Sequence, residues 1–268
     1  LIGFVPTMGA LHEGHLSLVR ASKQRADLTV VSLFVNPAQF GPREDYRRYP
    51  QDLEADSALL VREGADILFA PGVEEIYPAD FQSSVSVERL SEPLCGRFRP
   101  GHFRGVATVV LKLFNIVSPD VAFFGRKDAQ QSIVIQRLVR DLNLPIEVVV
   151  CPIVREPDGL AMSSRNAYLS AEERRAALAL SRSLERARKL LLGGERRAGV
   201  IVGEMRRLVE AEPRARIDYI EAVDAATLAP LSLIAGRALI ALAIWIGAAR
   251  LIDNLVADIE DGQVTVEL

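Results

Sequence analysis

Short apolar runs alternate with helical patterns through the first half of the chain. Continuous runs rich in Val, Ile and Phe, typical of strands buried on both faces, occupy residues 1–5, 28–36, 66–71, 120–125 and 146–152. Between them, apolar residues recur at helical spacing from Leu16, across 106–117 and across 135–142. This order of strand, helix and strand predicts a parallel sheet with crossover helices.

The pattern changes after residue 155. A long polar connection covers residues 155–170, and Ser170 with Glu173 form a capping box for a helix that runs to Leu192. A second helix follows. Strand-like runs with short links then occupy residues 217–224, 237–247, 249–258 and 263–268, which predicts an antiparallel sheet packed on helices. We therefore expect an α/β fold with two domains, a parallel-sheet domain over residues 1–154 and a smaller α+β domain over residues 155–268.

The composition argues against two classes of partner. The 268 residues carry a formal net charge of -3 at an isoelectric point of about 5.8, so a globally basic surface for nucleic acid is absent. The most apolar run, from Ala238 to Ala249, is well short of the ~20 residues that cross a bilayer. We expect a buried strand there, no membrane partner and no nucleic-acid partner.

Cysteine usage indicates the compartment. Cys95 and Cys151 are too few for a disulfide framework, and we expect each to be a buried free thiol. No secretory signal opens the chain. Both features favour the reducing cytoplasm. The chain starts in a strand pattern without an initiator Met, and we expect that a leading segment precedes it.

The first candidate for chemistry is PTMGALHEGHLSL, residues 6–18, where a predicted strand ends and a helix begins. His12 and His15 fall in the first helical turn, with Gly14 between them. Ligands of open parallel sheets bind at the carboxyl ends of the strands, and a helix N-terminus there favours an anion. The two imidazoles share one helical face and can donate hydrogen bonds to a phosphate as its charge builds up.

Two other interpretations of this pair stay open. Histidines at i and i+3 also occupy ordinary surface or core positions. A metal site is the other alternative, but the third histidine is His102 and the cysteines are not spaced as ligands. We therefore assign no metal ligands.

Other stretches carry polar groups suited to a phosphorylated ligand or its co-substrate. Hydroxyls, loop amides and a guanidinium in Met162-Ser163-Ser164-Arg165 can hold phosphate oxygens. Lys127 and Asp128 open a helix after a strand that ends at Gly125, so the lysine can reach β- and γ-phosphates. By itself, the first stretch is also compatible with an ordinary loop, and Lys127 with Asp128 is also compatible with a charge pair at a helix N-terminus.

Two more groups of residues are candidates for small-molecule recognition. Asn36, Gln39 and Tyr49 follow a strand end and can read hydroxyls and a carboxylate. The stretch RFRPGHFRG, with Arg99 and His102, is a basic island in an acidic protein and fits a local anion. A solvated loop is the alternative for both groups.

Taken together and in order, PTMGALHEGHLSL, FVNPAQFG, RPGHFRGV, FFGRKDAQQ and GLAMSSRN closely resemble the pantoate–β-alanine ligase family over essentially the whole chain. HxGH with a later Met-Ser-Ser/Lys loop marks the wider nucleotidyltransferase superfamily, and the long first string and the Gln-bearing motifs separate this family from its other members. The resemblance implies a Rossmann-like parallel sheet with the HxGH motif, a C-terminal domain that acts as a lid, and a homodimer.

The resemblance also implies an activity and a set of site residues. The activity is an ATP-dependent ligation of pantoate with β-alanine through a pantoyl adenylate, releasing pyrophosphate and AMP, with Mg²⁺ on the triphosphate. Catalytic roles are implied for His12, His15, Lys127, Ser163, Ser164 and Arg165, and further ATP contacts for Met8, Gly125, Asp128, Val154 and Met162. Substrate-binding roles are implied for Met8, Asn36, Gln39, Tyr49, Arg99, His102 and Gln131.

Two rival functions compete with this one. A nucleotidyltransferase that makes a CDP- or AMP-linked product without ligation does not account for Gln39 and Gln131. A catalytically inactive nucleotide-binding regulatory module predicts the loss of His12, Lys127 or Arg165, and all three are present.

Overall fold

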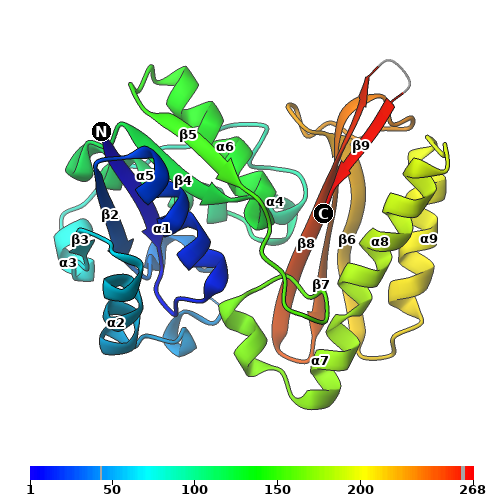
Figure 1. Cartoon of the computed structure of the whole chain (residues 1–268), viewed down its shortest axis with the longest axis horizontal. Coiled ribbons are helices and arrows are strands. Elements are labelled where there is room, and N and C mark those ends of the chain that lie inside the picture. The colour runs from blue at the N-terminus through cyan, green and yellow to red at the C-terminus, as the bar shows by residue number, and fades with distance from the viewer. Residues whose placement is uncertain (43, 261–262) are drawn as a thin grey trace. The chain divides into compact units, whose positions relative to one another are not determined.

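The computed structural model describes residues 1–42, 44–260 and 263–268 (Figure 1). The chain divides into two compact units, Leu1–Val154 and Arg155–Leu268, and each is described by itself. Unit 1 holds a parallel sheet in the order β3-β2-β1-β4-β5. Its strands are β1 (Ile2–Thr7), β2 (Leu28–Leu33), β3 (Ile67–Phe69), β4 (Val121–Gly125) and β5 (Glu147–Cys151). The Rossmann-like sheet expected from the sequence is confirmed.

Helices cover both faces of this sheet, which explains why its strands are apolar on both sides. On one face, Val5 and Phe123 pack against Leu18 of α1 (Glu13–Arg25) and Leu60 of α2 (Leu53–Glu63). On the other face, Phe4 and Phe124 pack against residues of α5 (His102–Val117) and α6 (Ala129–Asp141). Short helical segments complete the unit: η1 (Pro37–Gln39), η2 (Tyr46–Arg48), α3 (Val73–Ile76), α4 (Cys95–Phe98) and η3 (Arg126–Asp128).

Unit 2 holds the expected antiparallel sheet in the order β6-β7-β8-β9. Its strands are β6 (Ala215–Asp224), β7 (Gly236–Ile246), β8 (Ala249–Glu260) and β9 (Gln263–Glu267), and its helical segments are η4 (Ser164–Tyr168), α7 (Ala171–Ala177), α8 (Ala179–Leu192) and α9 (Ala198–Glu210). Helices α8 and α9 lie side by side on the sheet (Figure 1). Their buried residues, such as Leu184 and Met205, form one core with β7 residues such as Leu242.

Three details differ from the sequence-based expectation. The structure has a helix, α2, for which the sequence pattern predicts no element, because acidic and basic side chains obscure its narrow apolar stripe. Helix α5 begins at His102 and not at the first valine of its stripe. The helix predicted from Ser170 to Leu192 is interrupted at Leu178, whose N–H bonds to the carbonyl of Arg175 in a tighter turn.

Other expectations hold. Cys95 and Cys151 are free and buried. Most residues of the apolar run after Arg237 lie buried in β7. Within the described part of the chain, no helix combines the length and apolarity needed to cross a membrane.

Candidate functional site

The site in unit 1 lies where the strand order reverses. Strand β1 has β2 and β4 as neighbours, so the loops after β1 and β4 leave the sheet side by side at their carboxyl ends. The loop after β1 leads to His12, and β4 ends at Gly125 and is followed by Lys127 and Asp128 in η3. This topology brings two of the sequence-predicted motifs together.

His12 and His15 form the N-terminal cap of α1. The Nδ1 atom of His12 accepts from the backbone N–H of Gly14 at 3.2 Å, and Nδ1 of His15 accepts from the backbone N–H of His12 at 3.4 Å. The pair is thus a capping box in which imidazoles replace the usual Ser and Glu. Because each Nδ1 accepts, each neutral ring carries its proton on Nε2.

The electrostatics keep His15 neutral. Burial, the neighbouring His12 and the charge of Lys127 lower the pKa of His15 to about 3. The two rings lie against each other with their centroids 4.1 Å apart. The carboxyl end of β1 therefore offers an uncharged His15 N–H donor next to a lysine, at a helix N-terminus that itself favours an anion.

Sequence reasoning missed the residue that shapes this loop, Asp56 on α2. Its carboxylate is buried and accepts from the backbone N–H groups of Ala10 and Leu11, at 2.9 and 2.8 Å. The preceding Gly9 has φ of +80°, and a Cβ there would lie 2.9 Å from Asp56. The only sequence signal is an acidic residue on the apolar face of a helix, which is visible only once α2 is recognised.

Next to this loop, the structure joins Met8, Asn36 and Gln39. The Nε2 atom of Gln39 lies 3.1 Å from Met8 Sδ, and its Oε1 accepts from Nδ2 of Asn36 at 3.0 Å. Asn36 also bonds to the carbonyl of Gly105 and the hydroxyl of Tyr77. The expected acid-binding residues Met8 and Gln39 thus meet in one place.

Arg99 and His102 lie against the backbone of Gln39. His102 Nδ1 is 2.8 Å from the Gln39 carbonyl oxygen, and an Arg99 Nη donates to the same oxygen at 3.3 Å. The other ring nitrogen of His102 lies 3.0 Å from Arg99. Since Arg99 can only donate and the carbonyl can only accept, His102 is the neutral Nδ1–H tautomer, and burial with the nearby Arg99 lowers its pKa to about 4.

The remaining partner of this cluster is Glu44, which sequence reasoning did not select. It receives a bidentate pair of hydrogen bonds from Arg99, at 2.8 and 2.5 Å. Burial alone would raise the pKa of Glu44, but the hydrogen bonds and charge of Arg99 outweigh burial and lower it.

Three other predicted residues of unit 1 lie outside these two groups. Tyr49 is buried and meets Phe40 edge-on at 6.1 Å. Gln131 is half-buried on α6. Its neighbour Gln130 is a structural residue, because its amide ties down the backbone of Leu90, Pro93 and Cys95. Val154 is the last residue of unit 1.

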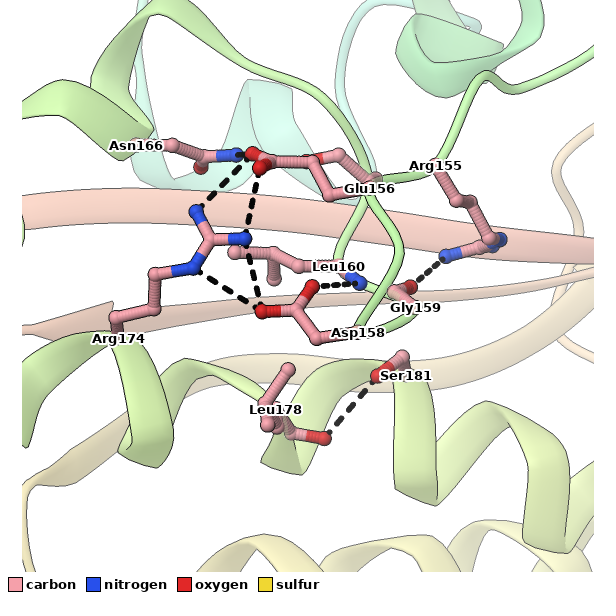
Figure 2. Close-up of polar contacts among 10 residues, drawn as sticks. Arg155, Glu156, Asp158, Gly159, Leu160, Asn166, Arg174, Leu178 and Ser181 are labelled. Atoms are coloured by element: carbon pink, nitrogen blue, oxygen red, sulfur yellow. Dashed lines mark hydrogen bonds and ion pairs between the residues drawn. The ribbon is translucent and has the colours of Figure 1, made fainter. Parts of the chain in front are cut away.

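In unit 2, the Met162–Arg165 segment is braced by ion pairs (Figure 2). Arg174, on α7, donates to both carboxylate oxygens of Glu156 and to Asp158, at 2.8 to 3.1 Å. Asn166 donates to Glu156 at 2.8 Å and to the carbonyl of Ala161. The hydrogen bond from Arg174 lowers the pKa of Glu156.

The segment itself carries groups of the kind that bind an anion. Ser163 caps η4, with its Oγ accepting from the N–H of Arg165 at 3.3 Å. The side chains of Met162, Ser163, Ser164 and Arg165 are half-buried between fixed ends. A short loop with hydroxyls and one guanidinium, anchored on both sides, is suited to bind phosphate oxygens.

Comparisons with known proteins identify the family to which the chain is similar. The chain matches the family model described as pantoate-beta-alanine ligase over residues 1–256. It is 58% identical to the pantothenate synthetase of Moorella thermoacetica, over 97% of this chain and 92% of the relative. It is 59% identical to that of Thermotoga neapolitana, over 95% and 91%.

Solved structures show the same similarity. The pantothenate synthetase of Thermus thermophilus superposes with a TM-score of 0.92 at 51% identity, covering 94% of this chain and 92% of that chain. The pantoate-beta-alanine ligase of Francisella tularensis, solved with beta-gamma ATP and beta-alanine, gives a TM-score of 0.77 at 36% identity, over 94% and 88%.

Proposed function

The chain belongs to the pantoate-beta-alanine ligase family, and on that premise we propose how its residues divide the work of the reaction. The protein is an enzyme that ligates pantoate to β-alanine with ATP. Unit 1 binds ATP and pantoate at the carboxyl ends of β1 and β4. Unit 2 supplies the Met162–Arg165 segment, which acts as a lid on the triphosphate.

The first step forms pantoyl adenylate. A carboxylate oxygen of pantoate attacks the α-phosphorus of ATP, the bond from that phosphorus to the bridging oxygen breaks, and pyrophosphate leaves. The attacking carboxylate is already ionised, so the step needs positioning and charge stabilisation but no general base. His12, His15 and Lys127 donate to the phosphates, and Gln39 with Met8 and Gln131 orients pantoate.

The uncharged His15 suits this step. A neutral imidazole can donate its Nε2–H to a phosphate oxygen without gaining or losing a proton. Because the pKa of His15 is about 3, this ring stays neutral at neutral pH. Lys127 supplies the positive charge. Ser163, Ser164 and Arg165 bind the leaving pyrophosphate, and Gly125, Asp128, Val154 and Met162 line the adenosine pocket.

In the second step the neutral amine of β-alanine attacks the acyl carbon, the bond from that carbon to the phosphate oxygen breaks, and AMP leaves. The amine proton passes to the departing phosphate. Tyr49, Arg99 and His102 are proposed near the entry of β-alanine.

Mg²⁺ is proposed to bind the triphosphate. Among the described residues there is no group of three or more His, Cys, Asp or Glu side chains that could hold a metal ion. The donors at the site are instead cationic or neutral N–H groups, which fit phosphate oxygens that already carry the ion. When bound, Mg²⁺ neutralises charge on the leaving pyrophosphate.

We also propose that the enzyme is a cytoplasmic homodimer. The two buried free thiols fit a reducing compartment, and the motif resemblance supports the dimer. Light scattering of the purified protein tests the dimer by its mass in solution.

The observation that carries the proposed roles is the pairing of the histidine cap with Lys127 at the strand-order reversal. The test measures pyrophosphate release from Mg·ATP, first with pantoate alone and then with β-alanine. We expect a burst near one equivalent that turns over only after β-alanine is added.

His12→Asn and Lys127→Ala should lower the burst rate by roughly 100- to 1,000-fold. Asparagine keeps a side-chain acceptor that caps α1 but removes Nε2–H, so His12→Asn separates chemistry from helix stability. Lys189→Ala, at an exposed position on α8, is the matched control. Near wild-type adenylation in both site variants would refute the assigned roles.

A further inference from the structure

Gln39 is fixed in unit 1 at both its side chain and its backbone. Asn36 holds its Oε1, and His102 and Arg99 hold its carbonyl oxygen. Its Nε2 points to Met8 Sδ, a weak acceptor. Gln39 is itself buried at the end of η1, so the direction of its amide is set by its surroundings.

The amide of Asn36 has only one possible orientation. Its Oδ1 accepts from the backbone N–H of Ala38 at 3.2 Å, and its Nδ2 donates to the carbonyl oxygen of Gly105 at 3.2 Å. A backbone N–H can only donate and a carbonyl can only accept, so a flipped amide would meet two mismatched partners. Tyr77 donates to the same Oδ1 at 2.9 Å.

All four hydrogen-bonding positions of Asn36 are therefore occupied within the protein. Two donors go to Gln39 Oε1 and Gly105, and two lone pairs accept from Ala38 and Tyr77. The residue is 1% exposed. Asn36 has neither the surface nor an unused polar position with which to contact a substrate, so its effect on binding must pass through Gln39.

The orientation of Asn36 determines that of Gln39. Because Nδ2 of Asn36 donates, Gln39 must turn Oε1 toward it, which turns the Nε2–H groups toward Met8. Gln39 thus presents donors to an incoming molecule. Donors suit the carboxylate or hydroxyl oxygens of a hydroxy acid, and they select against a group that can only donate.

Gly105 brings the two elements close enough for this arrangement. A Cβ at Gly105 would lie 2.2 Å from the carbonyl oxygen of Ala38 and 2.7 Å from the backbone nitrogen of Gln39. Ordinary contacts between such atoms need about 3.5 Å. Any side chain at position 105 would therefore push η1 away from α5 by more than an ångström.

We propose that Asn36 and Gly105 are positioning residues that fix Gln39 with its N–H donors directed at the acid substrate. The proposal rests on the proposed function in one respect, the contact between Gln39 and pantoate. It reassigns Asn36 from a direct substrate contact to a residue that acts through Gln39.

The test is a double-mutant cycle on kcat/KM for pantoate at saturating ATP. Gly105→Ala should lower kcat/KM by roughly 100-fold, because it displaces Gln39 by about 1 Å and a displacement of that size in a reacting geometry has an effect of this order. In the Gln39→Ala background the same change should cost less than about 2-fold, since the side chain through which it acts is gone. Gly203→Ala, on α9 where a Cβ meets nothing within 4 Å, is the matched control and should leave kcat/KM unchanged.

Equal losses in both backgrounds, or no loss in either, would overturn the proposal. If Gly105→Ala fails to fold by circular dichroism, Asn36→Asp replaces it. That variant keeps the shape of Asn36 but removes its donors, and the same non-additivity with Gln39→Ala is expected.

A failure of the proposed function looks different, because the wild-type enzyme would then release no pyrophosphate with pantoate. The positioning claim is also tested without substrate. The side-chain amide protons of Gln39, assigned by their loss in Gln39→Ala, should shift in the magnetic resonance spectrum of Gly105→Ala and not in that of Gly203→Ala. Unchanged Gln39 resonances in Gly105→Ala would overturn the proposal.

Discussion

Neutralising Asp253 should destabilise unit 2 more than neutralising any surface carboxylate. Arg155 donates to both oxygens of Asp253, at 2.8 and 3.0 Å. It also donates to the carbonyl of Gly159 (Figure 2). The Asp253 side chain is 1% exposed and that of Arg155 is 19% exposed. The pair joins β8 to the loop that leads to the Met162–Arg165 segment.

The magnitude follows from desolvation. Asp253→Asn keeps the shape but removes the charge, so the Arg155 guanidinium stays mostly buried without a counter-ion. Breaking one side of a buried pair costs about 3 kcal/mol or more. With a urea slope of about 2 kcal/mol/M, the unfolding midpoint should fall by about 1.5 M. Glu204→Gln, which breaks the more solvent-exposed ion pairs with Arg186 and Arg207, should cost less than about 1 kcal/mol.

The assay is selective for unit 2. Trp245, the sole tryptophan of the sequence, lies in β7 and donates its indole N–H to Asp218. Indole fluorescence in urea therefore reports the unfolding of the unit that contains the ion pair. The double variant Arg155→Met with Asp253→Leu should recover most of the lost stability, because it removes both charges. Equal midpoints for Asp253→Asn and Glu204→Gln, or no recovery in the double variant, would refute the reasoning.

Two further outcomes follow from the cap of α7 and the titration of His102. Ser170→Ala removes the oxygen that accepts from the Glu173 N–H, so it should lower the unfolding free energy of unit 2 by about 1 kcal/mol. The control Ser181→Ala, on α8, should change that free energy little. Trp245 fluorescence in urea measures both variants. The pKa of His102, about 4 in the folded protein against 6.5, means that the unfolded chain binds more protons between those values. Its contribution, up to about 3 kcal/mol, is fully present above pH 6.5 and is lost as pH falls toward 4. His102→Asn keeps a donor for the Gln39 carbonyl, and it should flatten that part of the stability profile measured by circular dichroism; an unchanged slope would contradict the assignment.

The strands of both units were predictable because buried strands are rich in apolar residues, which the sequence shows directly. The runs around Phe4, Val30 and Phe123 are apolar on both faces, and helices cover both faces of that sheet. Helix α2 was not predictable in the same way. Its stripe is interrupted by Asp56, whose carboxylate is buried because it accepts two backbone N–H groups from the loop before His12. The local sequence pattern shows the charge of Asp56, but it cannot show the distant backbone N–H groups that this carboxylate binds.

The histidine motif shows a different limit. Spacing predicts His12 and His15 at a helix start, and the structure bears this out with a capping box. On the sequence alone, phosphate binding competes with an ordinary surface or core position for the pair, and the sequence does not reveal the capping role. In the structure, capping and phosphate binding are compatible, because the cap occupies Nδ1 of each ring while the proton remains on Nε2. One nitrogen of each ring stabilises the helix and the other can serve a ligand.

The same accounting separates Asn36 from Gln39, two residues that the sequence could only group together. Both are amides after a strand end, and both have the donors and acceptors that a hydroxy acid requires. Their roles differ only in which of their polar atoms are already hydrogen-bonded within the protein. Asn36 has every polar position satisfied by groups within unit 1, whereas Gln39 has its oxygen engaged and its nitrogen facing a thioether. Since an engaged donor cannot also serve a substrate, we propose Gln39 as the residue that reads pantoate, with Asn36 and Gly105 setting the direction of its donors.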